Sequence, residues 1–185
     1  MCEEFRENFK GYHVNDKERC LKFISDKSYI IISDDRCWLG KGMYFWDNES
    51  NAIYWKKEKD RKNPGVENII VNSNIYINDE ILLDLTDEDV VNDLNDLWKA
   101  YCEKSGEKMN QPLGLKLDKL FDFFDELNEL KVIKCIGDYD IDRKNINYFI
   151  QRKNFNGPQV RGRLKTIYCI KDESVAVNRK VRCIL

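Results

Sequence analysis

The pattern of apolar and polar positions along the chain predicts short strands near both ends and two longer helices between them. A first strand is expected over residues 5–15, ending at His13. Asp16 then caps a helix that runs to about Ser25, because an aspartate side chain can accept the free N–H groups of the first helical turn. The residues expected on the buried face of this helix are Cys20, Leu21 and Ile24.

The next segments predict a strand, a turn, a second strand and a short helix. Residues 29–33 have the β-branched content of a strand, and residues 34–36 are expected to turn the chain. Residues 43–46 predict a short strand that is rich in aromatic side chains. The polar run 47–50 opens an amphipathic helix, and the charged run 56–62 is expected to form its solvated end and a loop.

The middle of the chain predicts two amphipathic helices, after strands at 66–71 and 74–77 and an extended apolar segment at 81–85. The apolar stripe of the first helix, which begins near Asp87, consists of Val90, Val91, Leu94, Leu97, Trp98 and Tyr101. The stripe of the second helix consists of Leu117, Leu120, Phe121, Phe124 and Leu127. Both stripes are most simply expected to face the core. The alternative is a partner-binding face of the kind that an antitoxin would use.

Strands return in the last third of the chain, at residues 131–136 and 164–171, and residues 175–185 close the chain. A helix is expected over 142–151 and a loop over 155–163. The chain contains no internal repeat. This order of elements predicts a single α+β domain over residues 1–185, in which two sheets pack around a cleft and the long helices form an insertion.

Composition narrows the class of protein. The chain has 185 residues and is 42% hydrophobic, which is enough for one domain with a proper core. The formal net charge of -2 argues against a large phosphate-binding surface but leaves room for a local basic patch. No apolar run approaches the roughly 18–20 residues that span a bilayer. The N-terminus has no apolar signal region, so we expect a cytoplasmic protein without a membrane partner.

The cysteines do not predict a metal site. There are seven of them with a single histidine, and no two cysteines have the Cys-x-x-Cys spacing. A structural zinc ion would therefore lack a plausible set of ligands. Free thiols in a reducing compartment are expected, and no metal.

The most informative stretch is residues 38–55, in which two glycines precede the aromatic strand. Gly40 and Gly42 predict an unusual backbone conformation, or a close approach by a ligand or another chain segment. The aromatic strand meets Tyr54 and Trp55 of the following helix at a cleft with a glycine floor, which suits a planar heterocycle. Aromatic residues at this spacing are also typical of a protein core, and that alternative stays open.

The segment Gly40-Lys41-Gly42-Met43-Tyr44-Phe45, followed by a polar run, Ala52 and an aromatic residue, resembles the second signature of the poly(ADP-ribose) polymerase-like ADP-ribosyltransferases. The first signature of that family is a histidine near the N-terminus, and His13 in Gly11-Tyr12-His13-Val14 stands in the corresponding place. The tryptophans around the glycine motif are similar to those of small bacterial, toxin-like members. The resemblance covers about residues 11–60 well and the rest by general layout. It implies a split pair of sheets around an NAD cleft.

The resemblance implies that NAD is the substrate and assigns roles to individual residues. His13 would bond the ribose on the adenosine side. The backbone of Val14, which replaces the glycine usual in the family, would meet the nicotinamide amide. Tyr44 and either Trp55 or Tyr54, depending on the register, would sandwich the nicotinamide ring. The residues expected to contact NAD are His13, Val14, Gly42, Tyr44, Tyr54 and Trp55.

The third position of the family, a glutamate at the start of a late strand, has no counterpart in this chain. Thr166 or Ile167 stands there, depending on the register, and Gln159 of the preceding loop is an alternative. Loss of the glutamate favours transfer of a single ADP-ribose over chain elongation, and it also allows an inactive NAD-binding domain. Arg161 and Arg163 lie in the loop where such enzymes meet their acceptor.

Three hypotheses follow. The first is a mono-ADP-ribosyltransferase of the toxin or phage-defence type, with His13, Tyr44 and Thr166 as catalytic residues and a protein or nucleic acid as acceptor. Cleavage of NAD builds positive charge on the ribose, so most of the catalysis would come from orientation and electrostatic preorganisation. The second is a module that binds NAD or ADP-ribose without turnover. The third is a partner-binding protein whose aromatic residues are core.

Overall fold

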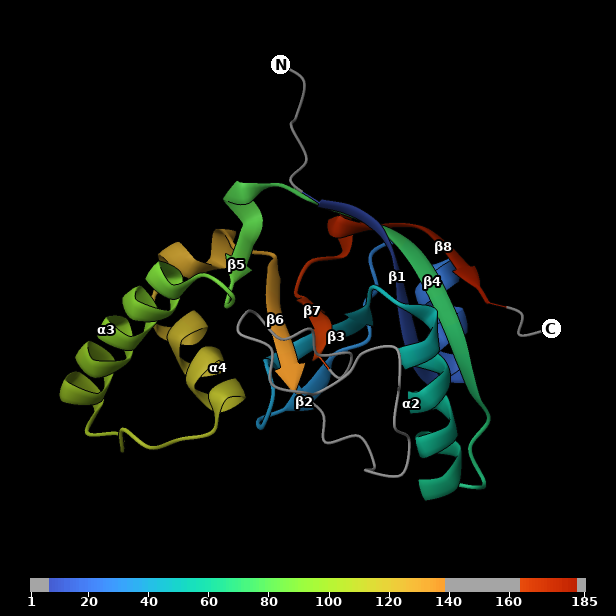
Figure 1. The fold of residues 1–185 in the computed structure, drawn as a ribbon, viewed down its shortest axis with the longest axis horizontal. Helices are drawn as coiled ribbons and strands as arrows, with labels where there is room; N and C mark the ends of the chain where they lie inside the picture. The colour runs from blue at the N-terminus through green and yellow to red at the C-terminus, as the bar shows by residue number, and fades with distance from the viewer. Residues whose placement is uncertain (1–6, 139–163, 183–185) are drawn as a thin grey trace, which may run out of the picture.

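The computed structural model describes residues 7–138 and 164–182, which form a mixed α+β fold (Figure 1). The strands of this part are β1 (Glu7–Asp16), β2 (Ser33–Asp35), β3 (Gly40–Trp46), β4 (Asn68–Ile77), β5 (Leu82–Asp84), β6 (Val132–Asp138), β7 (Leu164–Ile170) and β8 (Ala176–Val181). The α-helices are α1 (Lys17–Ser25), α2 (Glu49–Lys62), α3 (Glu88–Ser105) and α4 (Leu113–Phe123), and the short 3-10 helices are η1 (Asp79–Ile81), η2 (Asp125–Glu129) and η3 (Glu173–Val175). The predicted α+β class is confirmed, with α3 and α4 inserted between β5 and β6.

The strands follow one another in a single curled sheet. Their order is β5-β6-β7-β3-β1-β4-β8, and β2 pairs with β3 beside this path. All neighbours are antiparallel except β5 and β6, which are parallel. β1 pairs with β4 along its whole length, whereas it meets β3 at the one registered pair Tyr12 and Trp46. The two predicted sheets are therefore two halves of a single sheet, joined where β1 meets β3.

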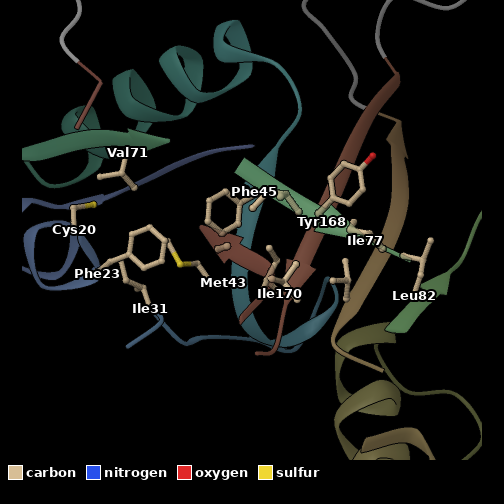
Figure 2. Packing of buried hydrophobic residues seen from close by; sticks show 14 residues of the cluster. Cys20, Phe23, Ile31, Met43, Phe45, Val71, Ile77, Leu82, Tyr168 and Ile170 are labelled. Atoms are coloured by element: carbon tan, nitrogen blue, oxygen red, sulfur yellow. The ribbon is translucent and has the colours of Figure 1, made fainter. Parts of the chain in front are cut away.

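Apolar side chains fill both faces of the sheet. The first core lies on the α1 side and contains Phe23, Met43, Phe45 and Ile170 (Figure 2). The second core lies on the side of α2 and α4 and contains Val14, Leu39, Trp46, Ala52, Leu117 and Ile167. Successive side chains of a strand point to opposite faces, so β3 sends Met43 and Phe45 into the first core and Trp46 into the second.

Polar side chains cap the helices where the sequence predicts them. The Asp16 carboxylate accepts from the backbone N–H of Arg19 at 2.9 Å, so it caps α1. Asp87 caps α3 in the same way, and Gly106 ends that helix in the left-handed conformation with φ of 73°. One detail of α1 was wrong, because Phe23 is buried with Cys20 whereas Leu21 is 45% exposed.

The strand predicted at residues 29–33 is wrong in position, since β2 comprises only Ser33–Asp35. Ile31 of the preceding segment packs in the first core. The carbonyl of Tyr29 accepts a hydrogen bond from the Arg179 guanidinium at 2.9 Å, so a side chain takes up the backbone group that a strand would pair with a neighbour. The β-branched residues of this segment pack against the core without pairing with a neighbouring strand.

Other element boundaries shift. The two strands expected at 66–71 and 74–77 are one strand, β4, with an irregular register opposite β8 between Asn72 and Asn74. The charged run 56–62 is helical throughout and completes α2. The second long helix ends at Phe123 rather than beyond Leu127. The helix expected at 142–151 and the loop expected at 155–163 lie outside the described residues.

Candidate functional site

His13 of β1 connects the two sequence motifs. It is buried, and its Nδ1 lies 2.7 Å from the carbonyl oxygen of Tyr44, 31 residues away. A carbonyl oxygen can only accept, so Nδ1 carries the proton and donates. Nε2 is left as the acceptor nitrogen, 3.4 Å from the Asn15 amide nitrogen. The histidine is therefore fixed in one tautomer by the backbone of the second motif.

Burial also fixes the charge of His13. Desolvation lowers the pKa of the ring from 6.5 to about 4, against the opposing effect of its bond to the Tyr44 backbone. At neutral pH the ring is uncharged, and Nε2 accepts from the Asn15 amide, so a ligand hydroxyl would bond to Nε2 in place of Asn15.

Tyr44 of β3 is held at its hydroxyl. The hydroxyl donates to the Gly40 carbonyl at 2.6 Å and accepts from the Leu39 backbone N–H at 3.1 Å. Gly40 is the first residue of β3 and Leu39 directly precedes it, so the side chain bonds back to the chain where its own strand begins. Because side chains alternate along β3, the Tyr44 ring lies on the side of the second core. The His13 ring lies on the side of the first core, and its centroid is 5.7 Å from that of the Phe45 ring.

The glycines of the motif make room for the protein itself. Gly40 has φ of 75°, and a Cβ there would lie 2.2 Å from Oδ1 of Asp118. A Cβ on Gly42 would lie 2.4 Å from Sγ of Cys169 and 2.9 Å from the Ile170 carbonyl oxygen. The space beside both glycines is filled by α4 and β7, which explains them without a ligand.

Asp118 of α4 holds this turn. Its carboxylate is buried and accepts from the Lys41 backbone N–H at 2.8 Å. Lys171 lies 4.0 Å from the same carboxylate and donates to the Lys41 carbonyl at 2.9 Å. Asp118 therefore ties the inserted helix α4 to the backbone N–H of Lys41, while Lys171, which follows β7, binds the carbonyl of the same residue. The sequence analysis missed Asp118, because an acidic residue beside an apolar stripe looks like an ordinary surface position.

Four aromatic rings cluster beside the motif. Trp38 meets Tyr44, Trp46 and Trp55 edge-on, at centroid distances of 6.5, 6.3 and 6.1 Å. Trp46 and Trp55 stack 6.0 Å apart at an interplanar angle of 13°. Of the two candidates on α2, Trp55 thus belongs to the cluster, whereas Tyr54 is 59% exposed and touches only its edge.

Asn51 is a second residue that the sequence analysis missed. It lies one helical turn before Trp55 on α2 and is 8% exposed. Its side-chain nitrogen is buried and has no hydrogen-bond partner among the described residues. A buried unsatisfied donor is costly, so the group is suited to an acceptor that arrives with a ligand.

The remaining predicted residues are divided between the two faces. Val14 and Ile167 are buried in the second core, and Ile167 pairs in register with Trp46. Thr166 is half-buried and, by alternation, lies on the opposite face with Tyr168. Gln159, Arg161 and Arg163 lie outside the described residues. The structure thus puts His13, Tyr44 and Thr166 on three adjacent strands, β1, β3 and β7, but does not bring their side chains together on one face.

The described part of the chain offers neither a metal site nor a membrane span. It contains no group of three or more metal-ligating side chains, and its five cysteines are free thiols. None of its helices is long and apolar enough to cross a bilayer.

These features define a mixed α+β protein in which a buried neutral histidine lies on one face of the sheet and an aromatic cluster on the other, with the glycine-containing strand β3 between them. A relative is an uncharacterized protein of Methanocaldococcus jannaschii, which is 30% identical over 77 residues. The aligned part is 40% of this chain and 36% of the relative, so the chain spans well under two thirds of that protein. No protein-family model and no solved structure matches the chain.

Proposed function

We propose that the protein transfers a single ADP-ribose from NAD to a protein or nucleic-acid acceptor, as a mono-ADP-ribosyltransferase of the toxin or phage-defence type. The observation that supports this most is the hydrogen bond from His13 to the Tyr44 backbone. It connects two segments that resemble the first and second signatures of the poly(ADP-ribose) polymerase-like enzymes. The strand that carries the third position, β7, is the other neighbour of β3.

His13 is suited to holding a ribose hydroxyl. Its acceptor nitrogen is fixed by the Tyr44 bond and stays unprotonated at neutral pH because burial lowers the pKa of the ring. A prearranged acceptor of this kind orients a sugar without losing side-chain freedom on binding.

Trp55 and Asn51 of α2 are suited to the nicotinamide end. Trp55 presents a large aromatic surface beside Tyr44 and Trp38, and an aromatic face suits a planar ring. Asn51 supplies a buried donor without a partner among the described residues, and the amide oxygen of nicotinamide is an acceptor. Tyr54 is the poorer candidate, since its ring is largely exposed.

The chemistry at the third position favours single transfer. A threonine cannot carry the negative charge with which a glutamate would stabilise the positive ribose. We therefore assign Thr166 a hydrogen-bonding role toward the ribose, and catalysis would rest on orientation.

The lack of a glutamate at the start of β7 also favours a second candidate, which is a module that binds NAD, ADP-ribose or a protein partner without turnover. The described start of β7 has Leu164, Lys165 and Thr166, and no carboxylate. Such a module would keep the ligand contacts of His13 and Trp55 and lack the acid.

Isothermal titration with NAD, ADP-ribose and nicotinamide tests the site under both candidates. We expect saturable binding of NAD, weakened about tenfold or more by His13→Gln and by Trp55→Ala. Tyr54→Ala is the matched control on the same helix and should bind as the parent does. Equal binding by all variants, or none by the folded parent, would contradict the proposed site.

A further inference from the structure

A cavity of about 830 Å³ lies between the helical pair α3 and α4 and the strands β6 and β7. Its walls include Trp38, Leu94, Trp98, Leu117, Cys135 and Ile167. Volume and apolar lining are in the range of small-molecule sites. His13, Tyr44, Trp55 and Thr166 are not among the lining residues, but Trp38 is, so the cavity adjoins the aromatic cluster of the candidate NAD site without including its other residues.

The wall contributed by α3 is one continuous stripe. Val91, Leu94, Asn95 and Trp98 line the cavity, and their spacing places them on a single helical face. Val91 is 43% exposed and Leu113 of α4 is 44% exposed, so apolar side chains continue to the mouth. The acidic residues of α3 do not line the cavity, and its interior therefore keeps an apolar, aromatic surface.

Of the lining residues that the structure describes, one is a cation. Lys116 of α4 lines the cavity, and its Nζ lies 5.7 Å from the centroid of the Trp98 ring. It forms no ion pair with an acidic side chain in residues 7–138 or 164–182. The carboxylate among the lining residues, Asp138, is engaged in an interaction of its own. Lys116 is thus the positive group that the described lining offers to a ligand, at a distance in the chain from the carboxylate of Asp138 at the end of β6.

We propose that this cavity binds a small amphiphilic anion. A planar apolar body would lie against Trp38 and the aliphatic walls, and a carboxylate, sulfonate or phosphate group would pair with Lys116. The Trp38 indole suits a flat ring system. Trp98 is buried and stacks on Tyr101, so its part is to hold the ammonium group of Lys116, which is partly withdrawn from water and gains from an anionic partner. The proposal does not depend on NAD chemistry, and it assigns the protein a second ligand site.

Two fluorescent probes that differ in charge test the proposal on the whole chain. The anionic probe 1-anilinonaphthalene-8-sulfonate should bind saturably, and more tightly than the neutral N-phenyl-1-naphthylamine. Lys116→Gln should weaken binding of the anionic probe about tenfold and leave the neutral probe unchanged. Lys99→Gln is the matched control, since Lys99 pairs with Asp96 on α3 and does not line the cavity.

A bulky side chain at the mouth tests the location. Val91→Trp should reduce binding of both probes about tenfold or more, whereas Val66→Trp, at an equally exposed valine outside the cavity, should not. Thermal unfolding followed by circular dichroism confirms that each variant is folded. The proposal is overturned if the folded parent binds neither probe, if Lys116→Gln leaves the anionic probe unaffected, or if Val91→Trp blocks neither.

Discussion

At the scale of single residues, Gly40 and His13 are each held by a group from a distant part of the chain. The neighbour of Gly40 is Asp118, 78 positions later in the chain. The Nδ1–H group of His13 donates a hydrogen bond to the backbone carbonyl of Tyr44. Neither contact has a signal in local periodicity, because both join segments that meet only in the folded sheet.

The buried neutral state of His13 predicts a pH dependence of stability. Its pKa is about 4 in the folded protein against an ordinary value of 6.5. Between these values the unfolded chain binds more protons, so the free energy of unfolding falls as the pH falls through this window. The full effect is about 3 kcal/mol, at about 1.36 kcal/mol per pKa unit, and it is absent above pH 6.5.

Urea unfolding of the parent and of His13→Gln, at steps from pH 7 to pH 4.5, measures this effect. His13 is the only histidine, so the variant should keep a nearly constant stability in the upper part of the window. Carboxylates titrate in both proteins at the acid end and cancel in the difference. Parallel curves for the two proteins would show that His13 is not buried in its neutral form.

Gly40 and Gly106 form a matched pair that separates backbone strain from crowding. Their φ angles are 75° and 73°. A Cβ atom added at Gly40 would have other atoms within 4 Å, whereas a Cβ atom added at Gly106 would have none. Gly106→Ala should cost about 1–2 kcal/mol, the price of the left-handed conformation. Gly40→Ala should cost about 3 kcal/mol or more, because Asp118 must move as well. Chemical denaturation checks both, and equal losses would refute the crowding at Gly40.

At the scale of elements, the sequence predicts caps and helices better than edge segments. Asp16, Asp87 and Gly106 act on their own helices, so their roles are visible locally. The β-branched content of segment 29–33 predicts a strand, and nothing in the segment reveals its partner Arg179, which comes some 150 residues later. The guanidinium of Arg179 donates to carbonyls at the end of α1, in the α1–β2 connection and in η3, and it covers the Phe23 ring at 4.2 Å.

Arg179→Lys should therefore destabilise the protein by about 2–4 kcal/mol, although the charge is kept. An ammonium group has a single nitrogen and cannot reproduce the planar fork that reaches several carbonyls at once. The control is Arg61→Lys, since Arg61 is exposed and, among residues 7–138 and 164–182, its ion pair is with Glu58 on its own helix. Its change should stay within about 0.5 kcal/mol. Hydrogen exchange should also show faster exchange at residues 26–32 in Arg179→Lys. Unchanged exchange at residues 26–32 would contradict the proposed role of Arg179 in holding this segment.

At the scale of the whole molecule, the order of elements predicts the α+β class and the inserted helices, but not how the strands connect. Sequence position cannot show that β1 and β3 meet at one registered pair while β1 and β4 pair along ten residues. The consequence is a sheet of two halves, with the motifs on the strands that flank the junction. The cavity under α3 and α4 also depends on this arrangement, since its walls come from segments as distant as Trp38 and Ile167.

Release of nicotinamide from NAD by the purified protein tests the central claim most directly. We expect release by the parent, lowered about a hundredfold or more by His13→Ala and by Trp55→Ala in variants that remain folded, and unaffected by Tyr54→Ala. Binding of NAD without release would favour the inert module. Release that persists in both His13→Ala and Trp55→Ala would contradict the site, and the absence of both binding and release would return the aromatic cluster to a purely structural role.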